Sequence, residues 1–128
     1  MTTQFLRQVL AADAVTGAAA GLVMVAGADV LAPLLQLNRD ILFYAGIAMA
    51  PFVVMLTWLA MQPQPQRTGV MTIVVLNALW VIGSIALIVT GIEQPNLLGY
   101  GFVIAQAVAV GVFAELEYIA LKRLARTA

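Results

Sequence analysis

Four long apolar segments dominate the chain, and short connections separate them. The apolar segments cover residues 5–27, 41–61, 68–90 and 97–121. Each is long enough to cross a hydrocarbon core of roughly 30 Å as an α-helix, which takes about 20 residues at 1.5 Å per residue. The pattern therefore predicts an all-α fold, a four-transmembrane-helix bundle that forms a single transmembrane domain over the whole chain.

The connection between the first two spans differs from the other two. Residues 62–66 alternate Gln and Pro, and residues 91–96 contain Gly, Glu, Pro and Asn, so both read as turns that end a helix. Residues 30–37, in contrast, are mostly apolar and include Pro33. This pattern predicts a short interfacial or re-entrant segment between the first two helices.

Composition excludes a water-soluble globule. The chain has 128 residues, of which 63% are hydrophobic and 9% charged, against roughly 45–50% apolar and 25% charged in soluble domains. A bundle of this size cannot hide that much apolar surface inside itself, so the excess must contact a lipid bilayer.

The charged residues and the missing residue types narrow the chemistry further. Six Lys and Arg balance six Asp and Glu, so no basic field is expected to hold a nucleic acid. The chain has no Cys and no His, which removes disulfides, thiol chemistry and the usual protein ligands of zinc, iron–sulfur clusters and haem. We expect no metal site and no cofactor.

Positive charge is unevenly distributed between the two ends of the spans. Arg39 lies at one end, and five basic residues lie at the end shared by both termini and the 62–66 connection. These five are Arg7, Arg67, Lys122, Arg123 and Arg126. The positive-inside rule then predicts that both termini are cytoplasmic.

Asp13 is the most informative polar residue inside a span. At 100° per residue it shares one helix face with Gly17 and Met24, and Gly21 flanks this face. Small residues allow close helix contact, so we expect Asp13 to point into the bundle. Gly17 and Gly21 form a GxxxG motif, which favours packing within the chain over a dimer interface, and a homo-oligomer stays open.

Two further helix faces carry polar residues that could meet. Asn77 and Trp80 share a face of the third span, and Gln106 shares a face of the fourth span with Glu117. One interpretation is an Asn77–Gln106 hydrogen bond that fixes the register of the two helices. The other is a ligand-binding site formed by these side chains.

Glu115 and Glu117 cannot act side by side, because two residues on a helix are separated by 200°. Asp13 could approach one of them, since all three lie near the same end of the bundle. Two adjacent buried carboxyl groups would share a proton, as in a proton-coupled carrier or a cation site. The alternative is that the glutamates reach interfacial water and pair with basic residues there.

Two groups of proteins resemble this chain. The sequences of residues 31–35, 77–80 and 114–118 resemble those of uncharacterised small four-helix membrane proteins of bacteria, which implies a multi-pass protein of the bacterial inner membrane but no activity. Length, four spans and an acid in the first span are similar to the small multidrug resistance exporters, although Asp13 stands where that family has Glu. This chain also lacks that family's third-helix aromatic pattern.

The sequence supports two functional hypotheses. The first is a noncatalytic inner-membrane protein that binds an apolar small molecule or a partner membrane protein. The second is a small proton-coupled transporter in which Asp13 is the membrane-embedded carboxylate. An enzyme is not expected, because no nucleophile and base stand at a recognisable spacing.

Overall fold

The computed structural model describes residues 2–127 and contains five helices over that range. They are α1 (Thr2–Ala26), α2 (Ala28–Leu35), α3 (Arg39–Met61), α4 (Arg67–Val89) and α5 (Leu97–Thr127). All except α2 are long and apolar enough to span a membrane. The structure thus confirms the all-α fold with four spans and a short helix between the first two.

The predicted helix ends differ most for the last span. Helix α5 continues to Thr127, six residues beyond the predicted end at residue 121. The extension contains Lys122, Arg123 and Leu124, which are good helix formers. Hydropathy marks where the helix becomes polar, whereas the helix itself continues.

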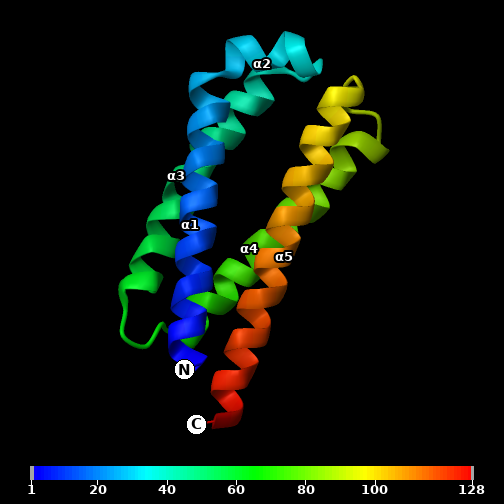
Figure 1. The fold of residues 1–128 in the computed structure, drawn as a ribbon. Helices are drawn as coiled ribbons and strands as arrows, with labels where there is room; N and C mark the ends of the chain where they lie inside the picture. Colours follow the sequence, from blue (N-terminus) through cyan, green and yellow to red (C-terminus); the bar gives the residue numbers. More distant parts are fainter. Residues whose placement is uncertain (1, 128) are drawn as a thin grey trace.

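The long helices form two antiparallel pairs, α1 with α3 and α4 with α5 (Figure 1). Glycines allow the first pair to approach closely: a Cβ atom on Gly46 would lie 2.9 Å from the Gly21 carbonyl oxygen, and one on Gly17 would lie 3.2 Å from Val53. The GxxxG motif of α1 therefore packs against α3 within the chain, as the sequence favoured.

The two pairs meet at the end of the bundle that carries the chain termini. A buried apolar cluster joins all four long helices there, and its members include Leu6, Leu10, Leu56, Leu59, Val70, Ile73 and Leu121. From this end the pairs diverge, so that α3 and α4 separate with distance from the loop that joins them (Figure 1).

Helix α2 bridges the pairs at the opposite end of the bundle (Figure 1). The Asn96 side chain donates from Nδ2 to the Leu34 carbonyl at 2.8 Å, and the Asn96 backbone N–H donates to the Leu35 carbonyl at 3.2 Å. Gly99 permits this contact, because a Cβ atom there would clash with the Leu35 carbonyl oxygen. The α4–α5 turn is thereby held against the end of α2.

The outward faces of the long helices are apolar. Large side chains such as Val15, Leu22, Val54, Ile82 and Val108 each expose more than 60% of their surface. Continuous apolar exposure of this kind is stable only in contact with lipid. The chain is accordingly a small polytopic membrane protein.

Candidate ligand-binding cavity

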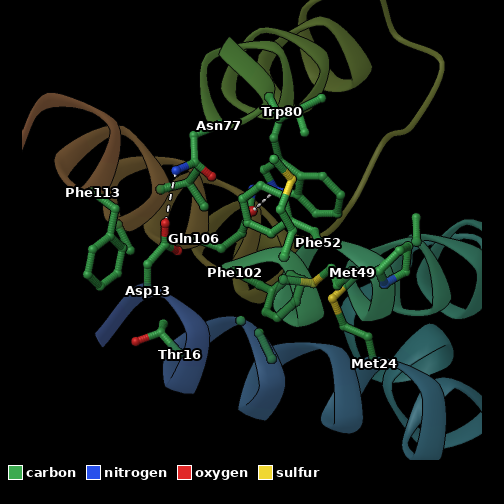
Figure 2. A pocket seen from close by; sticks show the side chains of 18 residues that line it. Asp13, Thr16, Met24, Met49, Phe52, Asn77, Trp80, Phe102, Gln106 and Phe113 are labelled. Carbon is green, nitrogen blue, oxygen red and sulfur yellow. Dashed lines mark hydrogen bonds between the residues drawn. The ribbon is translucent and has the colours of Figure 1, made fainter. Parts of the chain in front are cut away.

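A cavity of about 440 Å³ lies between the two helix pairs, within the 300–1,000 Å³ typical of small-molecule sites. Side chains from α1, α3, α4 and α5 line it (Figure 2). Its apolar wall includes Met24, Met49, Phe52, Trp80, Phe102 and Phe113. The divergence of the pairs creates this space, and Asp13, Asn77 and Gln106 give its wall a few polar groups.

Asp13, Asn77 and Glu117 form what we term the carboxyl cluster. They come from α1, α4 and α5, and each exposes less than 5% of its surface. Asn77 donates from Nδ2 to Asp13 Oδ2 at 3.0 Å and to Glu117 Oε1 at 3.0 Å; the bond to Asp13 is visible in Figure 2. One side-chain amide thus connects the two helix pairs.

The carboxyl cluster contains more acceptors than donors. An Asn side chain has two N–H groups, and Asn77 directs one to each carboxyl group. Glu117 Oε2 is buried and has no hydrogen-bond partner. Because Asn77 Nδ2 lies 3.0 Å from an oxygen of each carboxyl group, the two acids lie close together on either side of one nitrogen atom, and such a buried pair favours binding one proton.

No internal cation compensates the carboxyl cluster among residues 3–124. The ion pairs in this range join Arg39 to Asp29 at 2.9 Å and to Asp40 at 3.3 Å, at the α2 end. Arg7, on the same helix as Asp13, instead donates from Nε to the Ala60 carbonyl at 2.9 Å. In the same described part of the chain, no group of three or more His, Cys, Asp or Glu could hold a metal ion.

Trp80, Ser84 and Gln106 form a second polar group, which we term the amide clip. Trp80 Nε1 donates to Gln106 Oε1 at 2.6 Å, and Gln106 Nε2 donates to Ser84 Oγ at 3.0 Å and to the Val103 carbonyl at 2.7 Å. The Ser84 hydroxyl donates to the Trp80 carbonyl at 2.7 Å. Every side-chain donor in the clip is used, and the clip joins α4 to α5.

The predicted Asn77–Gln106 hydrogen bond is wrong. Gln106 bonds to Trp80 and Ser84, which lie about one and two helical turns beyond Asn77 on α4. Asn77 instead bonds to Glu117, which lies 11 residues beyond Gln106 on α5, about 16 Å along the helix. The two amides therefore lie at different levels of the α4–α5 pair.

The structure shows which of the two glutamates on α5 lies beside Asp13. Asp13 points into the bundle as expected, and its partner carboxyl group is that of Glu117. Glu115 is exposed on the other side of the helix, which agrees with the 200° separation. The alternative in which the glutamates reach interfacial water is wrong for Glu117, which is fully buried.

Several cavity residues could not be distinguished from the sequence. Phe52, Phe102 and Met49 line the cavity, but in an apolar span their residue types carry no sign of which side faces lipid. Met24 shares a helix face with Asp13, and Phe113 shares one with Gln106. This shared face is the one sequence signal that places these two side chains inward.

No known protein family, curated protein sequence or solved structure matches this chain. Its function is therefore inferred from the cavity and the residues around it.

Proposed function

We propose that this protein is a noncatalytic membrane protein that binds an apolar small molecule between its two helix pairs. The cavity is the observation that carries this proposal. Its volume, its Met and Phe lining and its few convergent polar groups are the features expected of a ligand site. Methionine and aromatic side chains adapt to varied apolar shapes.

The route of entry supports a ligand that dissolves in the bilayer. Pro51 on α3 and Leu76 on α4 line the cavity, and both side chains are exposed. Helices α3 and α4 diverge along this side (Figure 1), whereas α2 covers the end away from the termini. A lipid-soluble molecule would reach the cavity sideways between α3 and α4.

Filling the cavity tests this proposal. Ala20 lines the cavity, and Ala18 is exposed on the other side of α1. In lipid nanodiscs, an apolar photoactivatable alkyl probe should label the cavity residues Met49 and Phe102. Ala20→Trp should suppress this labelling and Ala18→Trp should not. Labelling that is confined to outward-facing side chains, and is unchanged by Ala20→Trp, would contradict the proposal.

A second candidate function, proton-coupled transport, is supported by the carboxyl cluster. Two buried carboxyl groups that share one amide donor are the arrangement expected of a proton-binding site in a membrane helix bundle. In proteoliposomes, Asp13→Asn should abolish flux driven by a pH gradient while circular dichroism shows the helices intact. Equal flux through the variant and the original protein would remove this candidate.

We also propose an orientation in a bacterial inner membrane with both termini cytoplasmic. The support is the excess of Lys and Arg at the termini end of the bundle. Because the chain has no Cys, single cysteines at Gln4 and Gln94 would report the two ends separately. A membrane-impermeant thiol reagent applied to intact cells should label the Gln94→Cys variant and spare Gln4→Cys.

A further inference from the structure

At the polar end of the cavity, no positively charged side chain neutralises the buried carboxyl groups. Asp13 both lines the cavity and belongs to the carboxyl cluster, whereas Glu117 lies behind it and does not line the cavity. Neither carboxyl group has a Lys or Arg within 4 Å among the described residues. An uncompensated charge in a membrane interior is strongly unfavourable, so it needs a proton or a cation.

One proton and one cation would satisfy the two carboxyl groups together. Glu117 is fully enclosed, and its Oε2 atom has no partner. Asn77 holds Glu117 close to Asp13, so a proton bound by Glu117 leaves one negative charge on the pair. Asp13 then keeps the single negative charge of the pair, at the position that a ligand in the cavity can reach.

The cavity extends away from this charge along an apolar wall. Met24 lies 11 residues beyond Asp13 on α1, and both line the cavity, a separation of about 16 Å along the helix. The aromatic and methionine side chains between these levels offer no partner for a second charge. The site therefore fits a molecule that is polar at one end and apolar along its length.

We propose that the ligand is a cationic amphiphile, an alkyl or arylalkyl amine in its ammonium form, whose N–H groups donate to the Asp13 carboxylate. This inference rests on the proposed function, since it assigns the chemical class of the ligand in the same cavity. An ammonium group supplies the missing donor and the missing positive charge together. A neutral apolar ligand would leave Asp13 uncompensated.

Trp80 provides a local reporter for this proposal. The chain has two tryptophans; Trp80 lines the cavity, and Trp58 is exposed on α3. In zwitterionic nanodiscs, the Trp58→Phe variant reports quenching in the cavity and the Trp80→Phe variant reports quenching from the bilayer. The probes are a primary alkylamine brominated along its chain and the alcohol with the same brominated chain.

The amine should quench Trp80 at a concentration about tenfold lower than the alcohol does, after correction with the Trp58 signal. Asp13→Asn should remove this advantage, so that the amine and the alcohol quench Trp80 at similar concentrations. Glu117→Gln should preserve the advantage, because Asp13 keeps its charge. Circular dichroism identifies any variant that fails to fold, and Glu117→Gln still tests the assignment if Asp13→Asn does not fold.

The outcomes separate the two proposals. If amine and alcohol quench Trp80 equally and more than Trp58, the cavity binds apolar ligands but the cationic class is wrong. If neither probe quenches Trp80 more than Trp58, the proposed function fails as well. Loss of the amine advantage in a folded Glu117→Gln variant would overturn the placement of the charge on Asp13.

Discussion

The carboxyl cluster and the amide clip are both polar groups in an apolar bundle, and they differ in how well their hydrogen bonds are matched. In the clip, every side-chain donor has an acceptor within helices α4 and α5. In the cluster, one amide serves two carboxyl groups, and one buried carboxyl oxygen has no partner. Saturated groups fix a structure, whereas unsatisfied buried groups point to a bound proton or ligand.

The two groups also connect different parts of the molecule. The amide clip joins neighbouring helices of one hairpin, so it sets their register. The carboxyl cluster joins α1 to α4 and α5, and thus lies at the contact between the two helix pairs. A change at the cluster, through protonation or ligand binding, acts directly on how the pairs are held together.

Gln106→Glu should give the largest effect, because it removes the N–H donors that Gln106 supplies to the amide clip. The new carboxylate cannot donate to Ser84 Oγ, and it would place an oxygen where Nε2 now lies 2.7 Å from the Val103 carbonyl. We expect a loss of about 3 kcal/mol or more in unfolding free energy. Thermal unfolding in a mild detergent measures this loss. An unchanged unfolding midpoint would show that the hydrogen bonds of Gln106 do not stabilise the protein.

Asn77→Leu should be the next largest change, because it removes the one amide that serves both carboxyl groups. We expect a loss of about 2 kcal/mol, since Asp13 and Glu117 would each lose a buried donor. The exposed neighbour Ala78 provides a matched control on the same helix, and Ala78→Leu should unfold at the original midpoint. Equal midpoints for Asn77→Leu and Ala78→Leu would contradict the bridging role of Asn77.

Glu117→Gln should act in the opposite direction from Gln106→Glu, although the two substitutions are chemically reciprocal. Replacing one carboxyl group by an amide adds donors where acceptors are in excess and removes a buried acid. We expect the free energy of unfolding to rise by about 1 kcal/mol. A fall of similar size would mean that the Glu117 carboxyl group is already satisfied.

A double-mutant cycle on the clip should give the smallest effect. Trp80→Phe and Gln106→Leu each leave one partly buried partner unpaired, whereas the double variant removes both sides of the 2.6 Å hydrogen bond. The coupling energy should be about 0.6 kcal/mol, a typical value for interhelical bonds in membranes. A coupling near zero would show that the Trp80–Gln106 bond adds nothing to stability.

Much of the candidate site could be predicted one helix at a time. The inward direction of Asp13 and the separation of Glu115 from Glu117 both follow from helical periodicity, and the structure confirms both. The Asn77 partner could not be predicted in this way. It depends on the register between α4 and α5, because Gln106 and Glu117 lie 11 residues, about three turns, apart on the same side of α5 and the register decides which of them is level with Asn77.

The sequence by itself determined that four helices cross a bilayer and that its few buried acids turn away from lipid. Those properties follow from local composition and the 3.6-residue period, which act within each segment. Only the tertiary structure decided that the helices form two diverging pairs with a cavity between them. Apolar faces of similar composition can contact lipid or one another at nearly equal free energy, so the choice depended on close glycine packing and a few interhelical hydrogen bonds.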